Sequence, residues 1–203
     1  MIIDVALLVA RACDQFAAAS VQGYVSGTLE RVVKESMTIK ARLLHYFPPS
    51  TSPVGNATRK DEENDSWCAL HVDDGCLTGL TSALFVDESS PLPQLTSTSK
   101  PEPFLTKSPD PLAGLYIRSR MSDVVKVNIP ADCLAFQTGS ALESMTGGAL
   151  KAVPHFVRGP AGNAAVARNT LAVFTQPNLE EIVDLKTGMT FGEHIKISDE
   201  KHA

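Results

Sequence analysis

The feature that most constrains this chain is a change of pattern near residue 40, after which the sequence consists of short apolar runs. These runs are rich in β-branched and aromatic residues, and Gly, Pro, Asp and Ser separate them, which is typical of strands joined by turns. About eight such strands predict a sandwich, barrel or jelly roll. The runs are ARLLHYF, SWCALHV, LTSALFV, GLYIRS, VVKVNI, DCLAFQT, ALKAVPHFV and NTLAVFT.

Two helical patterns precede these runs, over residues 3–20 and 23–35. Apolar residues recur in them at intervals of three and four, which predicts amphipathic helices that support the β layer. The sequence therefore predicts an N-terminal helical segment over residues 1–38 and a mainly β domain over residues 39–203. Two short helical turns are also expected, at GSALESM and at MTFGEHI.

Two stretches inside the β domain, near residues 49–65 and 87–111, are rich in Pro, Ser, Thr and charged residues. This composition disfavours burial, so both stretches are predicted to be long surface loops. The second stretch is long enough to lack regular structure in part.

Composition limits the kind of partner. The 203 residues include 43% hydrophobic and 20% charged residues, the balance of an ordinary globular protein with one core. The net charge is -5, and the Lys and Arg residues are scattered, which offers no basic surface for nucleic acid or an anionic membrane. The expected partner is therefore a small molecule, with no nucleic acid and no membrane.

The start of the chain, MIIDVALLVARACDQF, superficially resembles a signal peptide, but Asp4 interrupts it and no basic segment precedes it. No apolar stretch reaches the length of a membrane span. Irregularly spaced cysteines are expected to be reduced thiols rather than a disulfide framework. Together these features predict an intracellular soluble protein, most simply a cytoplasmic one, with a nuclear or organellar location as the open alternatives. The cysteines are Cys13, Cys68, Cys76 and Cys133.

Three residues of the β region have the composition of a metal site. In SWCALHVDDG, His71 and Asp73 are two positions apart, and alternation along a strand places such side chains on one face of a sheet. His155 follows in ALKAVPHFV, near the end of another expected strand. Two imidazoles and one carboxylate that leave open coordination positions form the facial triad of non-haem iron oxygenases. The sequence therefore predicts an iron site.

A pair of residues suited to binding a carboxylate follows His155. In VARNTLAVF, Arg168 and Thr170 share a strand face by the same two-residue spacing. A guanidinium binds a carboxylate through two hydrogen bonds and a hydroxyl adds another, which suits a dicarboxylic acid held near a metal. Arg168 could instead form a buried ion pair, since arginine is a frequent structural partner of carboxylates.

In this order, these residues resemble the isopenicillin-N-synthase-like branch of the 2-oxoglutarate and iron(II)-dependent dioxygenase superfamily. The likeness rests on HVD, on the distal PHFV and on RNT, which corresponds to the family's Arg-x-Ser. It continues through VVKVNIPADCLAFQTGSALESMTGGALKAVPHFV and covers roughly residues 41–177.

The resemblance implies a double-stranded β-helix, or jelly roll, behind the N-terminal supporting helices. It implies that His71, Asp73 and His155 bind iron, Fe(2+), and that Arg168 and Thr170 hold 2-oxoglutarate as cosubstrate. The implied enzyme is a dioxygenase that uses molecular oxygen, converts 2-oxoglutarate to succinate and carbon dioxide, and oxidises a small organic substrate, most often by hydroxylation. No catalytic residue is expected beyond the metal centre.

The chain departs from the family pattern in three places. The family often has Asn-x-Tyr-Pro on an early strand, whereas this chain has His45, Tyr46, Phe47 and Pro48, so a tyrosine hydroxyl is expected to be lost at Phe47. Thr170 replaces the family's Ser and keeps its hydroxyl. Family members also carry a longer N-terminal region, so the chain is expected to be shortened at its start.

Other hypotheses stay open. A shortened jelly-roll protein could keep the motif and bind a partner or small molecule without catalysis. An oxidase like isopenicillin N synthase would use Arg168 and Thr170 for a substrate carboxylate and need no 2-oxoglutarate. A zinc site at Cys68, His71 and Cys76 is disfavoured because the paired CxxC spacing is missing. The expected pocket walls are Phe47, Leu77 and Phe136.

Overall fold

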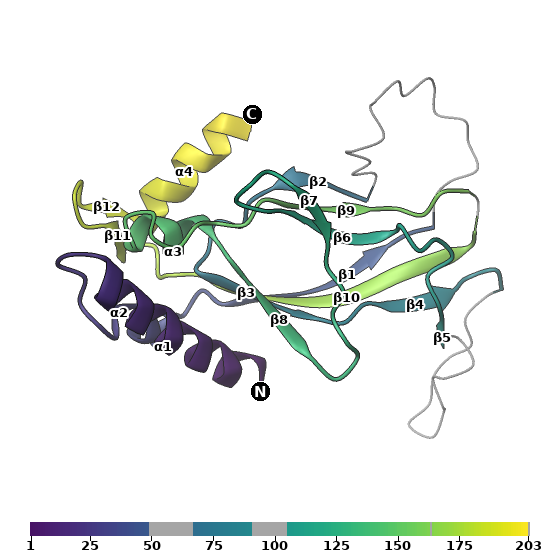
Figure 1. The fold of residues 1–203 in the computed structure, drawn as a ribbon, viewed down its shortest axis with the longest axis horizontal. Helices are drawn as coiled ribbons and strands as arrows, with labels where there is room; N and C mark the ends of the chain where they lie inside the picture. The colour runs from purple at the N-terminus through teal and green to yellow at the C-terminus, as the bar shows by residue number, and fades with distance from the viewer. Residues whose placement is uncertain (49–66, 91–104, 163, 203) are drawn as a thin grey trace.

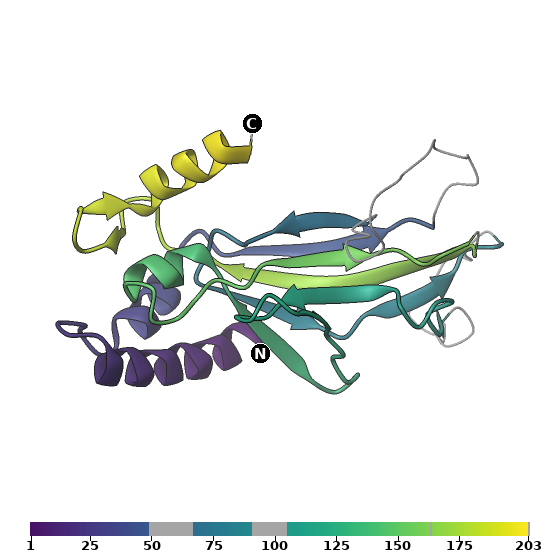
Figure 2. The ribbon, with the colours of Figure 1, turned by 45° about the horizontal axis from the view of Figure 1, so that its top comes forward.

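The computed structural model describes residues 1–48, 67–90, 105–162 and 164–202. Two antiparallel sheets form the body of the molecule, and the helices gather at one end of the strands (Figure 1). The turned view in Figure 2 shows the same separation of strands from helices. The predicted mainly β architecture is confirmed. None of the helices in the described ranges has the length and apolar character that crossing a membrane requires.

The larger sheet is built around one long strand, β10. Strand β1 pairs with one edge of β10 along its whole length, while β3 and β4 pair in succession with the other edge. Strands β8 and β5 extend the sheet beyond β3 and β4. Its members are β1 (Lys40–Tyr46), β3 (Leu77–Thr81), β4 (Leu84–Asp87), β5 (Leu105–Thr106), β8 (Leu134–Thr138) and β10 (Val166–Thr175).

The smaller sheet has four antiparallel strands in the order β2-β9-β6-β7. The pairing of β2 with β9 is irregular, with a register shift between Cys68 and His71. Such a bulge rotates the side chains that follow it. The members of this sheet are β2 (Cys68–His71), β6 (Gly114–Arg118), β7 (Val124–Lys126) and β9 (His155–Arg158).

Helices and a small hairpin close one end of the strands. Helix α1 packs on the larger sheet so closely that a Cβ added at Gly79 of β3 would lie 2.7 Å from Ile2. The division of the chain at residue 38 into a helical segment and a β domain stays a prediction. The elements at this end are α1 (Ile2–Ser20), α2 (Thr28–Glu35), α3 (Ser140–Met145), β11 (Ile182–Asp184), β12 (Met189–Thr190) and α4 (Phe191–His202).

The first two helices are joined by a buried carboxylate. Asp14 of α1 is 1% exposed, and its oxygens accept hydrogen bonds from the amides of Leu29 and Glu30 at 2.9 and 2.8 Å. These amides lie in the first turn of α2, where a helix has no internal acceptors for them. Tyr24 donates a third hydrogen bond at 2.6 Å. Asp14 therefore caps α2 from a neighbouring helix.

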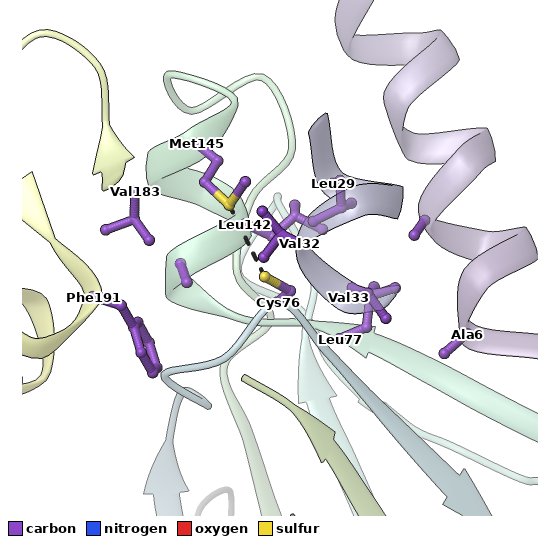
Figure 3. Packing of buried hydrophobic residues seen from close by; sticks show 12 residues of the cluster. Ala6, Leu29, Val32, Val33, Cys76, Leu77, Leu142, Met145, Val183 and Phe191 are labelled. Atoms are coloured by element: carbon purple, nitrogen blue, oxygen red, sulfur yellow. Dashed lines mark hydrogen bonds between the residues drawn. The ribbon is translucent and has the colours of Figure 1, made fainter. Parts of the chain in front are cut away.

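The main apolar cluster lies at the helical end, between α1, α2, α3, β3 and the hairpin (Figure 3). Its largest fully buried side chain is Phe191, at the start of α4. Burial of about a dozen apolar side chains here stabilises the fold by roughly 1.5–3 kcal/mol for each large one. The apolar cluster consists of Ala6, Ala10, Leu29, Val32, Val33, Cys76, Leu77, Ala141, Leu142, Met145, Val183 and Phe191.

Several element boundaries differ from the sequence prediction. The second helix begins at Thr28, later than expected, and the final helix extends to His202 rather than forming a single turn. The run LTSALFV is divided between two strands, with a break at residues 82–83. The predicted loop at 49–65 lies outside the described residues. Within the predicted loop at 87–111, Leu105–Thr106 forms β5.

Candidate metal centre and its cavity

Three side chains with metal-ligand chemistry converge at the end of the smaller sheet nearest α3. His71 ends β2, His155 begins β9, and the two residues are paired in register. Ligand atoms of His71, Asp73 and His155 lie within 4.8 Å of one another, and the described residues contain no other such group. Asp73 Oδ1 is 3.7 Å from His71 Nε2 and 3.8 Å from His155 Nε2. Small side-chain adjustments would bring all three onto one transition-metal ion.

Both histidines direct their Nδ1 atoms at backbone carbonyls. His71 Nδ1 is 2.8 Å from Ala69 O, and His155 Nδ1 is 3.0 Å from Val153 O. A carbonyl oxygen only accepts hydrogen bonds, so each Nδ1 carries a proton and each Nε2 faces Asp73. Metal-binding histidines are normally oriented by an acceptor of this kind.

Asp73 lies beyond the end of β2, so strand alternation does not position it. Instead the start of α3 holds the turn: Ser140 N donates to Asp73 O at 2.8 Å, and Ala141 N donates to Asp74 O at 3.1 Å. Gly139 permits this close approach, because a Cβ added there would lie 2.7 Å from Asp73 O. The position of the carboxylate therefore depends on a backbone turn packed against a helix.

The second carboxylate oxygen of Asp73 is held by the larger sheet. Thr78 Oγ1 and Gln137 Nε2 donate to Oδ2 at 2.5 and 2.7 Å, which leaves Oδ1 facing the histidines. Gln137 Nε2 also lies 3.0 Å from His155 Nε2. Sequence reasoning missed Thr78 and Gln137, although a polar residue within an apolar strand signals a buried group that needs a partner.

A cavity of about 270 Å³ extends between the two sheets from this group. Residues paired across the larger sheet line it in rows. One row contains Thr78 and Gln137, which bind Asp73, and we call this end of the cavity the metal end. Another row contains Arg168, which is six residues along β10 from Phe174 of the first row. We call that end of the cavity the anchor end. The row at the metal end consists of Lys40, Phe174, Thr78 and Gln137.

At the anchor end, Arg168 is only 6% exposed, and its Nε and Nη1 atoms are buried with no hydrogen-bond partner among the described residues. A buried donor without an acceptor is costly. The structure therefore gives no support to a buried ion pair at Arg168. Thr170 lies on the same side of β10, lines the same cavity, and donates from Oγ1 to Thr81 O at 3.3 Å.

Tyr46 rather than Phe47 faces the cavity. Tyr46 is paired with Arg168 in register, and its ring centroid lies 5.2 Å from the guanidinium carbon. Burial raises the pKa of Tyr46, while the charge of Arg168 and a hydrogen bond to it lower that pKa. Phe47 is 71% exposed, so the predictions of a pocket wall and of a lost tyrosine hydroxyl at Phe47 are both wrong. A shift of one residue reverses which side chains face inward.

The pKa values of the two histidines are shifted in opposite directions. The contact with the Cys68 thiol, together with the backbone carbonyl of Ala69 and the charge of Asp73, raises the pKa of His71 to about 9 against the effect of burial. Burial lowers the pKa of His155, and Asp73 opposes this shift. At neutral pH without a metal, His71 therefore carries the positive charge beside Asp73 while His155 is neutral.

The other expected pocket walls are also wrong, because Leu77 belongs to the apolar cluster and Phe136 packs against it. Cys76 lies in the same cluster, which separates it from any zinc site with Cys68 and His71. Cys68 does line the cavity, with its Sγ 3.8 Å from His71 Nδ1. The register shift in β2 explains why these two residues reach the same side despite their three-residue spacing.

No protein-family model matches the chain, and no curated protein matches it either. Solved structures do match. A proposed oxygenase from Shewanella oneidensis is similar over 98% of this chain and 61% of its own, with 14% identity and a TM-score of 0.67. A Neurospora crassa protein in complex with alpha-KG (2-oxoglutarate) matches over 99% of this chain and 55% of its own, with 15% identity and a TM-score of 0.61.

A dioxygenase for auxin oxidation from rice is similar over 96% of this chain and 55% of its own, with 16% identity and a TM-score of 0.53. The chain thus spans 55–61% of the length of these three structures. At such low identity the likeness establishes the shared fold, and the predicted jelly-roll architecture is confirmed.

Proposed function

We propose that this chain is an iron(II)- and 2-oxoglutarate-dependent dioxygenase that oxidises a small organic substrate, with hydroxylation as the outcome. One observation carries the proposal: a group of two histidines and one carboxylate shares a cavity with the buried guanidinium of Arg168, whose Nε and Nη1 have no hydrogen-bond partner among the described residues. The shared fold with oxygenase structures supports the same reading.

The donor set fits iron. Two imidazole nitrogens and one carboxylate oxygen occupy one side of an ion and leave positions for a chelating cosubstrate and oxygen. Thr78 and Gln137 fix the carboxylate, while Ala69 and Val153 fix the histidine tautomers. When bound, iron and 2-oxoglutarate together supply the oxygen-activating chemistry, and the cosubstrate leaves as succinate and carbon dioxide.

The anchor end fits the distal carboxylate of 2-oxoglutarate. Arg168 would donate from Nε and Nη1, which are otherwise unsatisfied, and the Thr170 hydroxyl would turn from Thr81 O to donate to the carboxylate. Tyr46 lies against the guanidinium and limits its rotation. Apolar residues of both sheets, including Leu44 and Val157, line the space between the metal group and Arg168.

Anaerobic titration with iron(II) and then 2-oxoglutarate tests the proposal, with the metal-to-ligand charge-transfer absorption band as readout. We expect a band that Arg168→Ala removes or shifts to much higher cosubstrate concentration, while metal binding persists. Arg120→Ala, a change of an exposed arginine outside the cavity, serves as the matched control. Admission of oxygen should then yield succinate.

Two results would overturn the proposal. Iron binding without any band in the presence of 2-oxoglutarate would favour an oxidase that binds a substrate carboxylate at Arg168. Failure to bind iron at all would favour a jelly-roll binding protein without catalysis.

A further inference from the structure

Two cationic side chains line the cavity near its metal end, where the proposed cofactor and cosubstrate give them no role. Lys40 and Arg42 alternate with outward residues along β1, so both lie on the cavity side of the strand, and both are exposed to solvent. Lys40 is paired with Phe174, whose other neighbour, Thr78, binds the carboxylate of Asp73. Lys40 therefore lies at the level of the metal group, and Arg42, paired with Ala172, lies two residues nearer to the anchor end.

Neither cation has a carboxylate partner in the part of the chain that the structure describes. The other arginines of this end are paired: Arg11 binds Glu30 at 2.7 Å, and Arg31 binds Glu181 at 2.5 Å. Arg42 instead lies over the ring of Phe174, with its guanidinium carbon 5.2 Å from the centroid. This stacking holds the guanidinium over the cavity and leaves its hydrogen-bond donors for a ligand.

The pair is separate from the proposed cosubstrate anchor. Arg42 faces Ala172 across the β1–β10 pairing, four residues from Arg168 on the same strand. Four residues of a strand span about 13 Å. A carboxylate group held by Arg168 therefore leaves Arg42 and Lys40 free for a second anion.

We propose that Lys40 and Arg42 form an anion subsite that binds the acidic group of the substrate, so that the substrate is a small organic acid. The acidic group is an oxyanion, a carboxylate or a phosphate. The apolar side chains of Phe174 and Leu80, which line the same part of the cavity, contact its carbon body beside the metal group. Calling this ligand the substrate rests on the proposed function, whereas the anion subsite itself does not.

Calorimetric titration of the protein loaded with Mn(II) and saturated with 2-oxoglutarate tests the subsite. The probes are benzoate, phenyl phosphate and benzamide, which is uncharged and similar in shape to benzoate. We expect at least one of the two anions to bind tenfold or more tightly than benzamide. Arg42→Gln should remove this preference, and the tighter anion identifies the acidic group.

Crossed variants separate this proposal from the proposed function. Arg168→Ala should weaken 2-oxoglutarate binding, while Arg42→Gln should leave 2-oxoglutarate binding unchanged and weaken only the anionic probe. Arg120→Gln, the exposed control, should weaken neither. Equal affinity for benzoate, phenyl phosphate and benzamide, or a preference that survives Arg42→Gln, overturns the anion subsite whatever the result for 2-oxoglutarate. If the unaltered protein does not bind 2-oxoglutarate, only the proposed function is overturned. The anionic probes can then be titrated against protein that is loaded with Mn(II) and has no cosubstrate.

Discussion

The apolar cluster and the cavity are built on opposite principles. In the cluster, apolar side chains fill the interior, and the buried carboxylate of Asp14, which joins α1 to α2, has three hydrogen-bond donors. The cavity instead buries Asp73, Gln137, His155 and Arg168, and leaves two guanidinium nitrogens unsatisfied. Buried polar groups of this kind lower stability unless a ligand satisfies them. Stability and ligand binding are therefore assigned to different regions, and this division can be tested.

The largest effect is expected for His71→Ala, which removes a metal ligand. The affinity for Mn(II) should fall more than about a thousandfold, well beyond the effect of changing an outer-shell partner. Above pH 9, where His71 is neutral, the free energy of unfolding of the metal-free protein should change by less than about 1 kcal/mol, because His71 is half-buried at the cavity. Calorimetry and urea denaturation measure the two quantities, with His45→Ala as the control. Unaltered Mn(II) affinity would contradict the metal assignment.

Asp14→Ala at the helical end should instead lower stability and leave metal binding unchanged. Loss of the cap and of the hydrogen bond to Tyr24 should lower the free energy of unfolding by about 2 kcal/mol. Metal affinity should stay the same. Urea denaturation checks the first expectation, with the exposed Asp4→Ala as the matched control. A large loss of metal affinity would show that the two regions are coupled.

A smaller effect is expected for Gln137→Leu, which removes one of the two donors to Asp73 Oδ2. The carboxylate then gains rotational freedom, and Mn(II) affinity should fall about tenfold. Calorimetric titration measures the change, and Gln22→Leu on the surface provides the control. If affinity is unchanged, Thr78 alone orients Asp73.

Acidification should weaken metal binding because a proton competes at His71, whose pKa is about 9. As pH falls below 9, the apparent dissociation constant for Mn(II) should rise by up to about tenfold per pH unit. Cys68→Ala removes the contact that contributes most to the raised pKa, so its pH dependence should begin at a lower pH. Titrations of both proteins with Mn(II) between pH 6 and 8.5 measure this difference. A flat profile would exclude a protonated His71 in the metal-free protein.

The smallest effect concerns two adjacent aromatic residues. Tyr46→Phe removes the hydroxyl beside Arg168 and should weaken 2-oxoglutarate binding about fivefold, the value of one hydrogen bond. Phe47→Leu should have no effect, because Phe47 is exposed. Titration of the charge-transfer band compares the two variants. The opposite result would mean that β1 has the other register.

Sequence patterns could predict the jelly roll and the five residues that share the cavity, because period-two alternation and the order of HVD, PHFV and RNT are both visible in the chain. The roles of these five residues stay predictions. Tyr46 could not be distinguished from Phe47, since a one-residue change of register exchanges the two faces of a strand. Asp73 was placed correctly beside His71 for the wrong reason: a turn against α3, and not strand alternation, positions it.

Other parts of the site carry only a weak sequence signal. Thr78 and Gln137 are polar residues of β3 and β8, and only their pairing across the sheet reveals that both contact Asp73. Cys68 reaches the cavity because of a register shift in β2, which the sequence pattern does not predict. Contacts that depend on long-range pairing are thus the ones that the sequence leaves undetermined.

The central position of β10 has a consequence for biosynthesis. It pairs with strands that are made much earlier, and His45 and Asn169, which are hydrogen-bonded at 2.7 Å, are 124 residues apart. Until β10 emerges from the ribosome, the nascent chain displays β1, β3 and β4 with unpaired edges, the kind of surface that promotes aggregation. The larger sheet and the cavity therefore stay incomplete until β10 has been made.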